Sequence, residues 1–162
     1  MRILTTFTLS IALLFQAGCS SDDGRPADMP PLFPVSVTIT QGGNPLEGAT
    51  VTLLSVTPAT YGEASGITDA SGTTRIFTYG YSGAPAGEYV VTVEKTGLEG
   101  AAQVTDPEGD VSFVGGQTFR YTDTLFAQRG TTTLKVTITN SAVSETFDIG
   151  EPVRVFVRDN TM

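Results

Sequence analysis

The sequence predicts an all-β domain, a two-sheet Greek-key sandwich of seven or eight strands. Short segments alternate apolar with polar residues, and turn-forming Gly, Pro, Asn and Asp recur about every 8 to 12 residues between them. After the first 19 residues, no segment carries an apolar stripe with the 3.6-residue period of a helix. We expect two packed sheets because a single open sheet of this width would leave its apolar face in water.

The first strand is expected over residues 35–40, where Val, Val and Ile alternate with Ser, Thr and Thr. Residues 41–45, Gln-Gly-Gly-Asn-Pro, predict a turn because glycine permits positive φ and proline fixes the φ that follows. Alternation resumes at residues 49–53, so a hairpin is the simplest connection between the two strands.

Further strands are expected at residues 62–69, 73–79, 87–95, 131–139 and 145–158. A turn at residues 69–72 pairs the first two of these, and its Asp69 side chain is expected to cap the turn. Residues 96–126 are long, glycine-rich and acidic, and we expect either an insertion at one end of the sandwich or a mobile loop. A local function would lie there.

The N-terminal segment has the pattern of a signal peptide. Arg2 precedes a mostly apolar run that ends in small residues, and polar residues follow at once, so the run is shorter than the roughly 20 apolar residues of a membrane span. Residues 17–19, Ala-Gly-Cys, resemble the lipobox of bacterial lipoproteins, in which the cysteine is diacylated and begins the mature chain. Gln16 departs from that pattern, which usually has an aliphatic residue there.

This resemblance implies that residues 1–18 are removed and that lipid on Cys19 anchors the protein. Ser20 is not the Asp that holds enterobacterial lipoproteins at the inner membrane, which implies an outer-membrane or surface location. Residues 19–33, rich in Pro, Asp and small residues, predict a flexible spacer. The alternative is an ordinary secretory signal with a coincidental cysteine.

The composition excludes several classes of function. The 162 residues suffice for one folded domain, expected at residues 34–158. Nine basic and seventeen acidic side chains give a net charge of −8, and without a basic cluster we expect no nucleic-acid partner. The chain has no His and one Cys, which removes Ser-His-Asp and Cys-His catalysis and the usual His-ligated metal sites. We therefore expect no enzyme activity and no cofactor.

Four motifs resemble, in order and spacing, the carboxypeptidase regulatory-like domain of small bacterial lipoproteins. They are PVSVTI at residues 34–39, GNPLEGATV at residues 43–51, GITDASG at residues 66–72 and GAPAGEYVVTV at residues 83–93, and residues 131–138 and 146–149 are similar to the closing strands of that family. The resemblance covers about residues 34–150 and implies a transthyretin-like sandwich. That family associates no catalytic residue with the domain, so the resemblance implies a fold and no site.

Two groups of side chains are candidate binding sites. Tyr79, Tyr81 and Tyr121, together with Tyr61, predict a surface that stacks against sugar rings, with core or edge packing as the simpler alternative. Asp106, Glu108 and Asp110 place three carboxylates within five residues, a density that suits calcium. The alternative there is a solvated acidic turn, and because the spacing lacks the full calcium-loop pattern, no metal is the main expectation.

Together these observations predict a non-enzymatic, lipid-anchored protein of the cell envelope. Its sandwich would serve a binding or structural role as an adaptor for another envelope protein, with the N-terminal lipid as its membrane contact. An acidic domain repels anionic lipid headgroups, so no protein surface is expected to assist the lipid. The alternative is a carbohydrate-binding module whose partner is an envelope polysaccharide.

Overall fold

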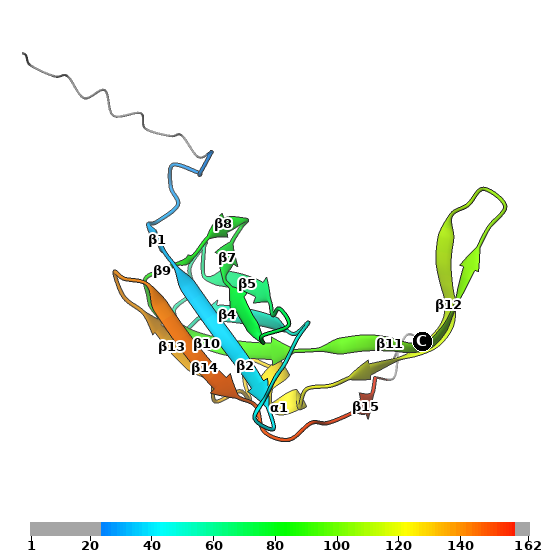
Figure 1. The fold of residues 1–162 in the computed structure, drawn as a ribbon. Coiled ribbons are helices and arrows are strands. Elements are labelled where there is room, and N and C mark those ends of the chain that lie inside the picture. The colour runs from blue at the N-terminus through cyan, green and yellow to red at the C-terminus, as the bar shows by residue number, and fades with distance from the viewer. Residues whose placement is uncertain (1–23, 158–162) are drawn as a thin grey trace, which may run out of the picture.

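The structure, a computed structural model, describes residues 24–157. Within this range nearly all regular secondary structure is β-strand, and two sheets pack face to face as a β-sandwich (Figure 1). The fold class predicted from the sequence is therefore confirmed. No helix in the described part of the chain has the length and hydropathy needed to cross a membrane.

The larger sheet contains six strands, which are in spatial order β13 (Lys135–Ile138), β10 (Gly87–Glu94), β4 (Thr50–Ser55), β5 (Glu63–Ile67), β7 (Phe77–Thr78) and β8 (Tyr81–Ser82). The smaller sheet contains β14 (Val143–Asp148), β2 (Val35–Gln41), β3 (Asn44–Pro45) and β6 (Thr73–Arg75). β14 runs parallel to β2, whereas the other described strand pairs are antiparallel. Several of these strands have only two or three residues, which is why there are more than the predicted seven or eight.

The core lies between the two sheets. Every second residue of β2 is buried, and Val37 and Ile39 are fully inaccessible. They belong to one apolar cluster with Val51 and Leu53 of β4 and Val91 of β10. Alternation in the sequence predicted these buried faces because successive side chains of a strand point to opposite sides.

The predicted hairpin between residues 35–40 and 49–53 is wrong, because β2 and β4 belong to different sheets. β2 instead pairs with β3, and the intervening turn uses two glycines at positive φ. The chain then crosses to the larger sheet through the buried Leu46 and Ala49. This crossing lets the two strands bury their apolar faces within one core.

The second predicted hairpin, between residues 62–69 and 73–79, is formed only in part. β5 pairs with β4, β6 pairs with β2, and β5 meets β7 only at Ser65 and Phe77. The turn between β5 and β6 does have the predicted cap: Asp69 Oδ1 accepts hydrogen bonds from the Ser71 hydroxyl (2.6 Å) and the Thr73 N–H (3.1 Å). These bonds, with one from the Ser71 N–H, hold the pKa of Asp69 below its ordinary value.

Residues 96–126 form an inserted hairpin and the start of a short helix, and not the mobile loop that was one of the two expectations. β11 (Thr96–Thr105) and β12 (Val111–Arg120) pair over almost their whole length, and β15 (Val155–Phe156) adds to β12 near the sandwich. The short helix α1 (Thr124–Ala127) follows. The sequence obscured the strands because glycines interrupt their alternation.

The predicted spacer at residues 19–33 is partly folded onto the sandwich. The Tyr81 hydroxyl donates to the Gly24 carbonyl (2.6 Å), and the Tyr61 hydroxyl donates to Asp28 (2.9 Å). Met29 is buried, and β1 (Leu32–Phe33) pairs with β9 (Ala84–Pro85). Residues 24–33 therefore belong to the folded domain, whereas Cys19 lies outside the described residues.

Candidate functional site

The most prominent feature outside the core is the β11–β12 hairpin, residues 96–120, which we call the arm. It runs away from the sandwich and then bends (Figure 1). Nine residue pairs, from Thr96 with Arg120 to Thr105 with Val111, fix its register. Apart from Phe119 at its base, none of its side chains is buried.

Three glycines produce the bend, which we call the elbow. Gly100, Gly115 and Gly116 have φ of 72°, 71° and 86°, values that other residues rarely adopt. A Cβ at position 116 would lie 3.0 Å from the Glu99 carbonyl oxygen, so the two strands approach too closely there for a side chain. The glycines therefore set the direction of the outer half of the arm.

The outer half of the arm carries apolar side chains into solvent. Between its base and its tip, the arm residues 100–105 and 111–118 include no charged side chain. Large apolar residues that are exposed along the arm are Leu98, Val104, Val111, Phe113 and Val114. Leu98 and Phe113 also line a hollow of about 320 Å³ at the elbow, together with Gly100 and Ala101. By strand alternation, Val111 and Phe113 lie on one face of the arm and Val104 and Val114 on the other, so apolar side chains are exposed on both faces.

The arm also has unpaired backbone edges. β11 is an edge strand of its sheet, and β15 covers β12 only at Phe119 and Arg120. A two-stranded ribbon alone is marginally stable in water, and an exposed edge strand presents backbone groups ready to pair with another strand. The arm therefore has both the apolar side chains and the open hydrogen-bonding edge of a docking element.

A charged cluster holds the C-terminal segment against the base of the arm. Glu99 accepts hydrogen bonds from Arg154 Nη2 (2.6 Å) and from the Tyr121 hydroxyl, and Arg154 lies 3.7 Å from the centroid of the Phe119 ring. The bonds from Arg154 and Tyr121 lower the pKa of Glu99 to about 2, and the bond to Glu99 raises the pKa of Tyr121. This pairing explains Tyr121, which the sequence presented as a candidate sugar-stacking residue.

The three acidic candidates for calcium binding lie at the tip of the arm. Asp106, Glu108 and Asp110 are exposed. Asp106 Oδ1 accepts the Asp110 N–H at 2.8 Å and thereby caps its own turn. No group of three or more potential metal-binding side chains is gathered within the described residues. The structure thus places these carboxylates in an exposed acidic turn and does not assemble a metal site from them.

The three candidate tyrosines do not share a surface. Tyr79 is 70% exposed at the β7–β8 turn, and the half-buried Tyr81 follows it. Tyr121 lies three residues before α1, and its N–H donates to the Lys95 carbonyl just past the end of β10. Figure 1 shows α1 at the end of the sandwich opposite β7 and β8, so Tyr121 is far from Tyr79 and Tyr81. The predicted three-tyrosine platform is therefore not formed.

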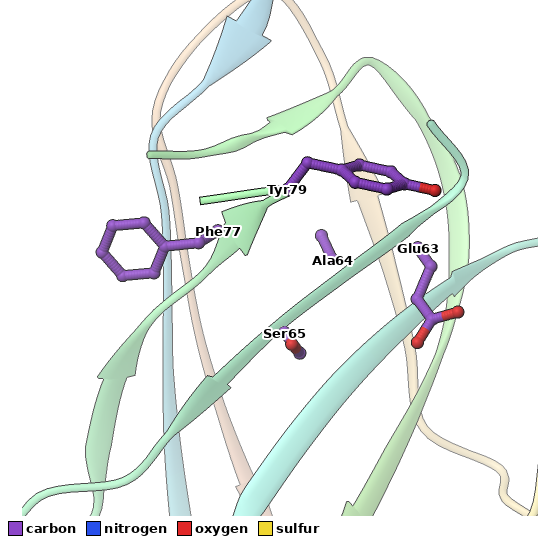
Figure 2. A pocket seen from close by; sticks show the side chains of 5 residues that line it. All are labelled: Glu63, Ala64, Ser65, Phe77 and Tyr79. Carbon is purple, nitrogen blue, oxygen red and sulfur yellow. The ribbon is translucent and has the colours of Figure 1, made fainter. Parts of the chain in front are cut away.

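Tyr79 instead borders a shallow hollow of about 260 Å³ on the outer side of β5 and β7 (Figure 2). Tyr61, which the sequence grouped with the candidate tyrosines, packs against Tyr79: the two ring centroids are 5.7 Å apart with an interplanar angle of 82°. Sequence reasoning missed Leu98, Phe113 and the other apolar side chains of the arm. The short alternating run at residues 111–114 was the available signal for them.

The fold and these surfaces define a β-sandwich domain with a projecting hairpin. No protein-family model matches the chain, and no curated protein matches it. Among solved structures it is similar to BcpA, the major pilin subunit of Bacillus cereus, with 18% identity, 76% of this chain and 30% of that chain covered, and a TM-score of 0.41. It is also similar to a 9R-lipoxygenase from Cyanothece, with 12% identity and a TM-score of 0.32. That match covers 73% of this chain and 16% of the lipoxygenase chain. Likenesses this distant say nothing about function.

Proposed function

We propose that this chain is a non-enzymatic, lipid-anchored adaptor of the cell envelope, with a carboxypeptidase regulatory-like sandwich that presents the arm to a protein partner. The arm carries the proposal because it exposes apolar side chains and an unpaired strand edge on an element that contributes nothing to the sandwich core. The lipobox-like residues at Cys19 and the acidic charge of the domain support the lipid as the membrane contact.

The arm specifies the chemistry of its partner. A partner strand that pairs with the free edge of β11 would satisfy backbone groups, and its alternating side chains would cover Val104 on one face of the arm and reach toward Phe113 on the opposite face. One apolar side chain would enter the hollow at the elbow. Asp106, Glu108 and Asp110 at the tip favour a partner with Lys or Arg next to that strand, because opposite charges orient the encounter.

The proposal is tested by site-specific photo-cross-linking in the native envelope. A photoreactive phenylalanine analogue at Phe113 in the full chain should form an adduct with one other envelope protein, mapped to a strand flanked by basic residues. The matched control is the same analogue at Ile67, which is 68% exposed but lies on the sandwich. Equal adducts at both positions, no adduct at 113, or adducts only with a second copy of this chain would overturn the proposal.

A further inference from the structure

The β7–β8 turn holds an aromatic residue in an unfavourable backbone conformation. Tyr79 is the one non-glycine residue with positive φ (50°) in residues 24–157. With Gly80 (φ 87°) it forms the two-residue loop that closes the Thr78–Tyr81 pair. Such loops favour Asn or Asp before Gly, and a bulky side chain is disfavoured there. Backbone strain of this kind concentrates at binding sites.

The fold gains little core packing from the strained residue. The Tyr79 side chain is 70% exposed and is absent from the core cluster. Tyr61 meets its ring edge-to-face, and the Tyr61 hydroxyl is itself fixed by Asp28 at 2.9 Å. The Tyr79 ring is therefore held in one place at the surface and still offers aromatic area to solvent.

Two hollows adjoin this ring. The first, about 260 Å³, is lined by Glu63, Ala64, Ser65, Phe77 and Tyr79, and Figure 2 shows the Tyr79 ring extending over Ala64 and Glu63 while the Phe77 ring points away. The second, about 240 Å³, shares Tyr79 and Glu63 and adds Thr57, Thr60 and Arg129 among others. Arg129 Nη2 donates to the Ser55 carbonyl at 2.6 Å, which fixes that wall.

We propose that this surface binds a saccharide, with a pyranose ring stacked on Tyr79 and its hydroxyls donating hydrogen bonds to Glu63. A sugar ring has an apolar C–H face and a rim of hydroxyls, and the site matches both with an aromatic ring beside carboxylate and hydroxyl groups. Because Tyr79 and Glu63 border both hollows, two successive sugar rings fit the site better than one. This site is separate from the arm.

The test is calorimetric titration of the full chain with chitotetraose, maltotetraose and cellotetraose. A parallel titration uses phosphatidylcholine vesicles with and without a galactolipid, which separates a free glycan from a glycolipid headgroup as the source of the sugar. We expect at least one probe to bind, and Tyr79→Asn to weaken it about tenfold or more. The same variant should raise the unfolding temperature, because Asn relieves the turn.

Two further variants complete the test. Glu63→Gln should weaken binding without changing the unfolding temperature, because Glu63 is exposed. Val104→Ser on the arm, combined with the photoreactive analogue at position 113, should leave saccharide binding unchanged while it weakens the partner adduct, so the two proposals fail independently. Binding by none of the probes, or equal binding by Tyr79→Asn and the unaltered chain, would overturn the saccharide site.

Discussion

At the scale of residues, the most strongly perturbed ionisable group is Glu99 at the base of the arm. Its pKa is about 2 in the folded protein against an ordinary value of 4.5, because Arg154 and Tyr121 donate hydrogen bonds to the charged form. A carboxyl with a lowered folded-state pKa stabilises the fold above its unfolded pKa, and that contribution is lost as the pH falls through the folded value. The contribution of Glu99 is thus complete above about pH 4.5 and disappears toward pH 2.

We therefore predict that Glu99→Gln makes the unfolding temperature less dependent on pH between 4.5 and 2, with the largest difference from the unaltered protein above pH 4.5. Thermal unfolding followed by circular dichroism at several pH values measures this. Arg154→Gln is the matched variant, because it removes the first cause of the low pKa and should produce the same flattening. Parallel curves for the unaltered protein and both variants would contradict this account of the cluster.

Residue patterns predicted buried positions better than they predicted surface roles. Val37, Ile39, Val91 and Val93 were expected inside from alternation and are fully inaccessible. The Asp69 cap was expected because it depends on groups within four residues. The partners of Tyr121 are different: Glu99 and Arg154 are brought to it by the arm and by the C-terminal segment, and no local pattern encodes that meeting.

At the scale of elements, strand positions were predictable, but strand partners were not. Residues 35–40, 49–53 and 87–95 match β2, β4 and β10, because period-two alternation is a local signal. Which sheet a strand joins depends on which apolar faces meet in the core, and this long-range requirement places β2 and β4 in different sheets. The arm was missed as strands because Gly100, Gly115 and Gly116 break the alternation that defines a strand in sequence.

At Gly66, β5 lies directly against β6. A Cβ at this position would clash with the Arg75 carbonyl oxygen and with Thr74 Oγ1. We predict that Gly66→Ala lowers the free energy of unfolding by about 1–3 kcal/mol, because backbone atoms must move to admit the methyl group. Urea titration measures the change.

Gly130→Ala is the control for this prediction. Gly130 lacks a positive φ, and nothing lies within 4 Å of its potential Cβ, so its substitution should change the free energy of unfolding by less than about 0.5 kcal/mol. Equal stabilities for the two variants would mean that the two segments are farther apart at Gly66 than the structure places them.

At the scale of the whole molecule, the contacts of residues 24–33 determine which end of the sandwich would face a membrane. Five residue steps separate Cys19 from Gly24, and a chain of that length spans at most about 18 Å. Gly24 is hydrogen-bonded to Tyr81 beside the β7–β8 turn. Lipid on Cys19 would therefore hold this end, with the proposed saccharide site, near the bilayer surface.

The anchor itself is tested by metabolic labelling with an alkyne-bearing fatty acid. We predict that the unaltered chain incorporates the label and that its mature form begins at Cys19, whereas Cys19→Ser incorporates none, because the thiol is the point of acylation in the lipobox resemblance. Ser20→Ala is the control and should label normally. Labelling is the decisive measurement, since an uncleaved signal segment would itself hold Cys19→Ser in the membrane. No label on the unaltered chain, or a mature chain that begins elsewhere, would replace the lipid anchor with an ordinary secretory signal, and equal labelling of Cys19→Ser and the unaltered chain would place the lipid on another residue.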